Sequence, residues 1–215
     1  MLSFSSLFAI DETKARADGL KMPLVNIVDE LLLMPLIRWQ AAQIYQHFDN
    51  YFVPDTLTLC SILVRLTGLA CLFYDAEPQF LPGVGRRAKR LIAGASFMVG
   101  YYFDCFDGYY ARKYNKCTMF GCWLDHLNDI TMCGAYFVLA LRKKMWLSAA
   151  LMAIMLVFVV NQVLLEEEAF GNHTEFFNLV TRLAAPFRLF RTSAFMRYFG
   201  TSSWFLVVAC ALALE

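Results

Sequence analysis

The chain has 215 residues, of which 59% are hydrophobic and 16% aromatic, and its formal net charge is +1. This apolar content exceeds the roughly 45–50% of ordinary soluble domains, which argues against a soluble protein. The near-neutral charge argues against a nucleic-acid partner, because such partners are bound by basic surfaces. The seven cysteines are scattered without a C-x-x-C pair, which indicates buried thiols rather than a disulfide framework.

The first part of the chain precedes the strongly apolar segments. Residues 1–22 are predicted to form an N-terminal tail. Over residues 23–53, apolar and polar residues mix at helical spacing, which predicts an amphipathic juxtamembrane helix lying on the membrane. Trp39, Tyr45 and Tyr51 suit that depth, and Pro35 should kink the helix. The alternative is an ordinary amphipathic helix packed against a core.

Four apolar stretches follow, over residues 57–74, 91–106, 125–141 and 146–165, and each is a candidate span. The segment 75–90 contains prolines and glycines and predicts a loop. Arginines, among them Arg182, Arg188 and Arg191, interrupt residues 172–199, which could form a fifth span or an interfacial helix. Residues 204–214 are apolar but shorter than the roughly 20 residues that a bilayer needs, so the C-terminal span is expected to be incomplete.

These elements predict an all-α integral membrane protein, with a bundle of about five to six transmembrane helices preceded by the amphipathic interfacial helix. Residues 54–215 would form its transmembrane catalytic domain. Arg65 lies within the first span. A lone arginine at that depth either snorkels to the interface or is paired, although it could also face a site.

Four aspartates between the second and third spans are the main candidate site. Asp104 and Asp107 are three positions apart, and Asp125 and Asp129 are four apart. On two helices, each pair would present both carboxylates on one face, and the faces could converge on hard cations. Ligand sets made only of oxygen suit Mg²⁺, Mn²⁺ or Ca²⁺ rather than zinc.

The residues around these aspartates follow the pattern D-x2-D-G-x2-A-R-x8-G-x3-D-x3-D, which resembles the signature of the CDP-alcohol phosphotransferase family of integral membrane enzymes. Every signature position matches: Asp104, Asp107, Gly108, Ala111, Arg112, Gly121, Asp125 and Asp129. The segment from Pro54 to Thr58 resembles the Pro-Asn-x-x-Thr opening of the family's first membrane helix, with Asp55 in place of the usual asparagine.

The resemblance implies roles for these residues. Asp104, Asp107 and Asp125 would be metal ligands for Mg²⁺ or Mn²⁺, with two ions expected, and Asp129 would be the general base and a further metal ligand. The CDP pocket would be shaped by Gly108, Ala111, Arg112 and Gly121, with Thr58 at its edge. The implied reaction is attack by an alcohol on the β-phosphorus of a CDP-linked donor with release of CMP, where at least one substrate is a lipid.

Three functions stay open at this point. A phosphatidyltransferase that uses CDP-diacylglycerol is favoured over a CDP-choline or CDP-ethanolamine:diacylglycerol phosphotransferase. The rival from another class is a non-catalytic membrane protein that binds divalent cations. The partners expected are a CDP-linked donor, an alcohol acceptor, the membrane and, as a further candidate, a second copy of the chain. In a eukaryotic host the resemblance implies the endoplasmic reticulum with the site facing the cytosol, although the positive-inside rule disfavours that orientation.

Overall fold

The structure is a computed structural model that describes residues 29–48, 54–170 and 201–215. In these ranges the chain is helical, apart from turns and connections, and contains no strand. The elements are η1 (Asp29–Leu33), a π-helix, and the α-helices α3 (Met34–Phe48), α4 (Asp55–Phe73), α5 (Arg86–Lys113), α6 (Met119–Arg142), α7 (Trp146–Phe170) and α10 (Thr201–Leu214). The predicted all-α class is therefore confirmed.

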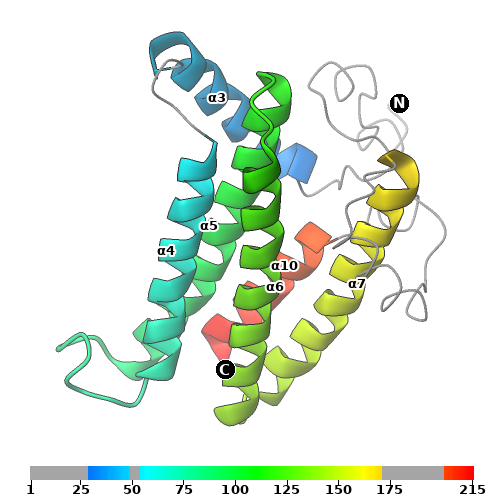
Figure 1. Cartoon of the computed structure of the whole chain (residues 1–215). Helices are drawn as coiled ribbons and strands as arrows, with labels where there is room; N and C mark the ends of the chain where they lie inside the picture. The colour runs from blue at the N-terminus through cyan, green and yellow to red at the C-terminus, as the bar shows by residue number, and fades with distance from the viewer. Residues whose placement is uncertain (1–28, 49–53, 171–200) are drawn as a thin grey trace, which may run out of the picture.

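The helices form an up-and-down bundle, in which α4, α5 and α6 lie side by side and α10 packs against α5 and α7 (Figure 1). The chain runs in one direction along α4, returns along α5 and reverses again along α6. The start of α4, the end of α5 and the start of α6 consequently share one end of the bundle. The aspartate-bearing segments lie near that end, and α3 crosses it (Figure 1).

Small residues and aromatic rings build the core between these helices. Phe205 of α10 stacks on Phe97 and Tyr101 of α5, with ring centroids 5.0 Å and 4.2 Å apart. Gly94 lets α10 approach α5 closely, since a Cβ there would lie 2.4 Å from the carbonyl oxygen of Ala209. Glycines allow this kind of close helix packing in membranes, where no hydrophobic effect drives helices together.

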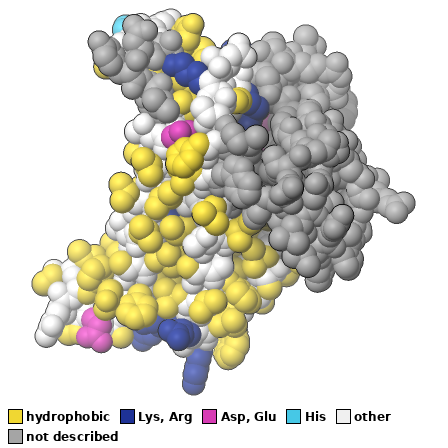
Figure 2. All heavy atoms as spheres, in the orientation of Figure 1, with side chains coloured by type: hydrophobic (Ala, Val, Ile, Leu, Met, Phe, Trp, Pro, Cys, Tyr) yellow, Lys and Arg dark blue, Asp and Glu magenta, His cyan; other side chains and the backbone are white. Residues whose placement is uncertain are grey.

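The described part of the face in Figure 2 is apolar between its two ends. On the face in Figure 2, hydrophobic side chains cover the middle of the described part, and charged side chains gather toward the upper and lower ends. Leu59, Leu63 and Leu66 of α4 are all exposed. Such a band is what a lipid-facing surface requires.

Only α4, among the described helices, is both long and apolar enough to cross a membrane by length and composition, with 19 residues and a mean hydropathy of 1.8. Two further apolar stretches, Trp146–Val159 and Ser203–Leu214, are shorter. The expected count of about five to six spans and the interfacial position of the helix over 23–53 therefore stay predictions. Residues 1–28, 49–53 and 171–200, which include the predicted tail and the arginine-rich segment 172–199, lie outside the described residues.

Several helix ends differ from the sequence-based ranges. α5 begins at Arg86 and ends at Lys113, whereas the second span was predicted for 91–106. The prediction followed hydropathy, which detects only the apolar part of a helix. The charged residues at both ends of α5 are also good helix formers, so the helix extends beyond the apolar range. Pro35 lies in the first turn of α3, where proline is tolerated, and the backbone changes from π to α just before it.

The other end of the bundle is held together by charge. Asp75, which follows α4, has a fully buried side chain and accepts hydrogen bonds from Arg86, Arg90 and Lys143 at 3.0, 2.9 and 2.7 Å. Its single carboxylate therefore joins the end of α4, the start of α5 and the end of α6. Glu215 also lies at this end and accepts a hydrogen bond from the backbone N–H of Ser148 at 2.9 Å.

Candidate active site

The antiparallel course of α4, α5 and α6 brings the signature residues to one end of the bundle. The Oγ1 of Thr58 on α4 donates a hydrogen bond to Oδ2 of Asp107 on α5 at 2.5 Å. Asp107 is only 4% exposed, and Thr58 only 2%. The structure thus places the predicted pocket-edge threonine directly on one of the predicted metal ligands.

The two aspartate pairs face each other across α5 and α6. Asp104 interacts electrostatically with Asp125 and Asp129, and Asp125 in turn interacts with Asp107. Four carboxylates this close repel one another unless cations lie among them. The convergence of two helix faces that the sequence predicted is therefore present in the structure.

Two oxygens of this cluster are unsatisfied. Oδ1 of Asp104 and Oδ1 of Asp125 are buried and have no hydrogen-bond partner among the described residues. Buried polar atoms are nearly always bonded, so an orphaned carboxylate oxygen is a place where a cation would be stabilising. The donor chemistry, which is oxygen only, fits Mg²⁺ or Mn²⁺.

The four carboxylates lie close together but do not form a complete metal-binding site. Within the described residues, no three His, Cys, Asp or Glu side chains are arranged to hold a metal ion together. Part of the reason is visible in the contacts, because Asp107 is bonded to Thr58 and Asp129 is bonded to Arg65. Each of these two carboxylates therefore has one oxygen already bonded to a neighbouring side chain.

Arg65 is the residue whose role the sequence left open. Its side chain is fully buried, and Nη1 donates to Oδ1 of Asp129 at 2.6 Å. Nη2 lies 3.9 Å from Oδ1 of Asp104. Of the alternatives weighed above, pairing at the site is therefore correct and snorkelling is wrong. A signal was present, since Thr58 and Arg65 are seven positions apart and so share one face of a helix.

The glycines of the signature lie where side chains approach closely. A Cβ on Gly108 would lie 3.0 Å from Nη1 of Arg112, so the guanidinium of Arg112 folds back over this glycine. A Cβ on Gly121 would lie 2.6 Å from Oδ1 of Asp55. Asp55, which stands where the family has asparagine, therefore packs against the first turn of α6.

Ala111 and Thr118 make hydrogen bonds in the connection between α5 and α6. The carbonyl of Ala111 accepts a hydrogen bond from the N–H of Lys116 at 2.8 Å in the turn that ends α5. Thr118 caps α6, and its Oγ1 accepts from the N–H of Gly121 at 2.9 Å. This local chemistry fixes the short connection that carries the chain from one aspartate pair to the other.

Helix α3 is attached to the same end of the bundle. Tyr45 of α3 stacks on Tyr114, which follows α5, with ring centroids 4.1 Å apart. The hydroxyl of Tyr102 on α5 donates a hydrogen bond to the side-chain oxygen of Gln40. These aromatic and polar contacts hold α3 next to the aspartate end.

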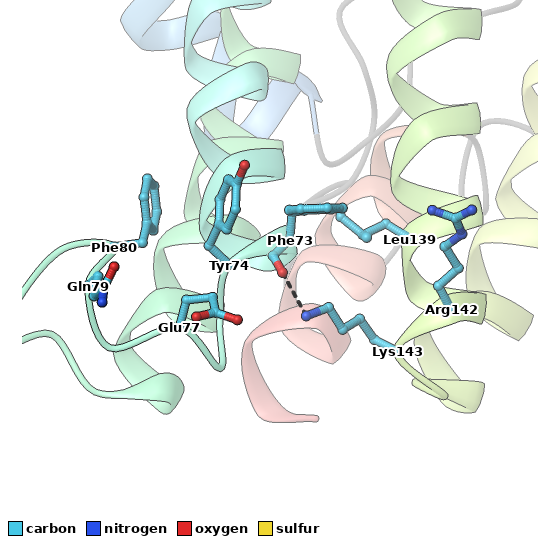
Figure 3. Close-up of a pocket in the computed structure, with 8 residues that line it drawn as sticks. All are labelled: Phe73, Tyr74, Glu77, Gln79, Phe80, Leu139, Arg142 and Lys143. Carbon is cyan, nitrogen blue, oxygen red and sulfur yellow. Dashed lines mark hydrogen bonds between the residues drawn. The ribbon is translucent and has the colours of Figure 1, made fainter.

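A cavity of about 590 Å³ lies at the opposite end, between the end of α4, the loop that follows it and the end of α6 (Figure 3). Phe73, Leu139 and Arg142 are among its lining residues, and Lys143 donates a hydrogen bond to the carbonyl of Phe73 at 2.7 Å. None of the signature residues lines it. The cavity is therefore separate from the candidate active site.

The comparison with protein families agrees with the signature. A family model described as CDP-alcohol phosphatidyltransferase matches residues 51–214, which is most of the chain. The chain belongs to the CDP-alcohol phosphatidyltransferase family. The match begins just before α4 and includes every signature residue described above.

Curated relatives resemble this family member over part of its length. A protein of Rickettsia bellii named CDP-diacylglycerol–glycerol-3-phosphate 3-phosphatidyltransferase is 30% identical over 92 residues, which cover 43% of this chain and 45% of the relative. A probable phosphatidylglycerophosphate synthase of Mycobacterium tuberculosis (strain H37Rv) is 32% identical over 84 residues, which cover 39% of this chain and 37% of the relative. The chain thus spans less than half the length of these relatives. No solved structure gives a significant match.

Proposed function

We propose that this protein is a phospholipid-synthesising phosphatidyltransferase that uses CDP-diacylglycerol as donor and releases CMP. The observation that carries the proposal is the cluster of four aspartates, in which buried oxygens of Asp104 and Asp125 are left without partners, with Arg112 folded over Gly108 in the same signature. Family membership supports the reaction type, and the names of the relatives favour glycerol 3-phosphate as the alcohol.

In this reaction the hydroxyl oxygen of the alcohol bonds to the β-phosphorus of the donor, and the bond from that phosphorus to the bridging oxygen of CMP breaks. Asp129 would accept the hydroxyl proton, which is general-base catalysis by a carboxylate. Arg112 would offer a planar set of N–H donors to the phosphate oxygens, and Gly108 leaves room for its guanidinium.

Asp104, Asp107 and Asp125 would hold Mg²⁺ or Mn²⁺, while Asp129 would serve as the base. When bound, such ions neutralise the diphosphate and stabilise the leaving phosphate. The pocket for the cytidine and diphosphate would be formed around Gly108, Ala111, Arg112 and Gly121, with Thr58 at its edge. A cluster that binds only cations would gain nothing from the adjacent guanidinium of Arg112.

The deciding experiment measures CMP release by the full chain in detergent micelles or vesicles. The panel pairs CDP-diacylglycerol with glycerol 3-phosphate, serine or inositol, and CDP-choline or CDP-ethanolamine with diacylglycerol. We expect release with CDP-diacylglycerol, and loss of release in Asp125→Asn but not in the control Glu77→Gln at the opposite end. Release with CDP-choline or CDP-ethanolamine alone would reassign the donor. Tight Mn²⁺ binding without CMP release from any donor would favour the non-catalytic cation-binding protein.

The membrane arrangement belongs to the same proposal. We place the chain in the membrane as a bundle of about five to six spans, in the endoplasmic reticulum of a eukaryotic host, with the aspartate end toward the cytosol. A homodimer is compatible with this arrangement. Cys117 is exposed between α5 and α6, so a membrane-impermeant thiol reagent added from the cytosolic side should label it. A Lys144→Cys variant in a Cys117→Ser background should be labelled only from the other side, and the reverse result would invert the orientation.

A further inference from the structure

Burying the charged side chain of Arg65 in the bundle costs free energy. It lies in α4, the helix most suited to crossing a membrane, and its side chain is fully buried. Replacing a buried ion pair with apolar side chains is often neutral or stabilising, so stability alone does not account for an arginine here. An ionisable side chain at such a depth is more readily explained by a function at the site it faces.

The bundle is built around this side chain. Gly100 of α5 makes room for it, because a Cβ there would lie 2.4 Å from Cγ of Arg65 and 2.5 Å from Nε. The hydroxyl of Tyr136 on α6 donates to the backbone carbonyl of Arg65 at 3.1 Å, and the ring of Phe205 lies 5.9 Å from the guanidinium carbon. Residues of α5, α6 and α10 therefore enclose Arg65.

Its contacts with the aspartates are unequal. Nη1 is 2.6 Å from Oδ1 of Asp129, a short charge-assisted hydrogen bond, whereas Nη2 is 3.9 Å from Oδ1 of Asp104, too far for one. The side chain of Asp129 is 28% exposed, compared with 14% for Asp104. Asp129 thus has one oxygen fixed by a cation of the protein itself, while its carboxylate still reaches accessible space.

Asp129 therefore differs from Asp104 and Asp125. Asp104 and Asp125 each keep a buried oxygen without a hydrogen bond, as a cation site requires. Asp129 is already paired, and a divalent ion beside it would be repelled by the guanidinium. An arginine that recognised a donor phosphate would instead present its Nε–Nη2 edge to the ligand. Here Nε faces Gly100 in the interior of the bundle.

We infer that Arg65 is a positioning residue for the transfer reaction. It holds Oδ1 of Asp129 so that the other oxygen faces the hydroxyl of the alcohol, and it keeps Asp129 out of the metal-ligand set. The inference rests on the proposed function, because it assigns Arg65 a task in that reaction. The effect of Arg65 on metal binding can also be measured without turnover.

The test is a double-mutant cycle with Arg65→Gln, Asp129→Asn and the double variant, measured as CMP release at saturating donor. Arg65→Gln should lower kcat about 100-fold, within the range that a general base contributes, with little change in KM for the donor. In the Asp129→Asn background the same substitution should have no further effect. Arg65→Lys should recover part of the lost rate, and the control Thr67→Val, on the exposed face of α4, should retain wild-type kcat.

The second readout is Mn²⁺ binding to the full chain in detergent, followed by electron paramagnetic resonance. The dissociation constant for Mn²⁺ should fall at least about tenfold in Arg65→Gln, because the freed Asp129 carboxylate can then join the metal ligands. In the Asp129→Asn background the same substitution should lower it much less. An unchanged Kd in Arg65→Gln, or an equal fall in Kd with and without the Asp129 carboxylate, would overturn the inference. Equal losses of kcat with and without the Asp129 carboxylate would also overturn it, as would a rise in donor KM alone.

Different results would refute the proposed function and the proposed role of Arg65. If the wild-type chain releases no CMP from any donor, the proposed function is wrong, and the Mn²⁺ comparison still decides whether Arg65 keeps Asp129 out of the metal set. If the wild type is active but the double-mutant cycle is additive, the proposed function stands and the role of Arg65 is wrong. Should Arg65→Gln fail to fold, Arg65→Lys replaces it in the same cycle.

Discussion

Thr58 and Asp107 are bonded side chain to side chain across the α4–α5 contact, with 2.5 Å between Oγ1 and Oδ2. The bond joins a residue near the start of α4 to one near the end of α5, and both residues are buried. A hydrogen bond to a carboxylate in such surroundings restricts its rotation. Thr58 therefore sets the direction in which Asp107 can offer its other oxygen to a cation.

Removing the Thr58 hydroxyl should impair the site. Thr58→Val keeps the shape of the side chain but leaves Oδ2 of Asp107 without its hydrogen bond. An unsatisfied buried acceptor of this kind costs about 1–3 kcal/mol of free energy. We expect CMP release to fall about tenfold, and Thr58→Ser to restore most of it. Thr67→Val is the matched control, since the hydroxyl of Thr67 is exposed and bonds only to the carbonyl of Leu63 in its own helix. Equal losses in Thr58→Val and Thr67→Val would contradict the assigned role.

Divalent cations should be required for turnover. The four aspartates lie close together, and the orphaned oxygens of Asp104 and Asp125 need a cation. A chelator should abolish CMP release, and added Mg²⁺ or Mn²⁺ should restore it. In Asp125→Asn, the Kd for Mn²⁺ should rise by at least about tenfold. Full turnover in the presence of chelator would exclude a metal-dependent mechanism.

The contact of α5 with α10 should depend on Gly94. A Cβ at this position would lie 2.4 Å from the carbonyl oxygen of Ala209 and 3.2 Å from Cβ of Ala213. Gly94→Ala should therefore separate the helices, lower stability by about 1–3 kcal/mol and reduce the apparent Tm in detergent. Gly134→Ala is the control, because a Cβ there meets nothing within 4 Å. It should leave Tm unchanged or raise it, as alanine favours helix more than glycine.

The charge cluster around Asp75 should give stability that is lost in acid. Burial would raise the pKa of Asp75, but hydrogen bonds from Lys143, Arg86 and Arg90 outweigh burial and hold the pKa at about 2. Because this is below the unfolded value of about 3.9, the contribution is complete above roughly pH 4 and is lost as the pH falls through about 2. Asp75→Asn should cost about 2 kcal/mol at neutral pH.

The measurement for Asp75 is apparent Tm against pH for wild type, Asp75→Asn and the control Glu77→Gln in the same loop. The wild-type and Asp75→Asn curves should converge toward pH 2, while Glu77→Gln should follow the wild type throughout. A gap between wild type and Asp75→Asn that stayed constant from pH 7 to pH 2 would show that the ionised carboxylate is not the source of the stability.

The sequence predicted the main features of the site because they depend on local geometry. Asp104 and Asp107, like Asp125 and Asp129, are spaced to share a helix face, and a short connection brings the two faces together. The partners of these residues were less predictable. Thr58 was placed near the pocket only by resemblance, since a hydrogen bond between residues 49 positions apart depends on how α4 packs on α5.

Arg65 and Asp75 show what the sequence could not supply. The spacing of Thr58 and Arg65 places them on one face of α4, but it does not tell which aspartate that face meets, so the partner of Arg65 could not be chosen from the sequence. Asp75 lies in a segment identified only as a loop. Its role depends on cations from Arg86, Arg90 and Lys143, which the fold brings together only after α5 and α6 have formed.

The position of the aspartates at one end of the bundle affects how a two-chain lipid could reach them. Near that end Thr58 bonds Asp107 and Arg65 bonds Asp129, so α4, α5 and α6 are tied together there as they are around Asp75. A lipid donor would therefore approach from the leaflet that meets the aspartate end. Donor and product would then exchange with a single leaflet, and vesicles carrying the donor lipid only in the opposite leaflet would support turnover no faster than that lipid flips.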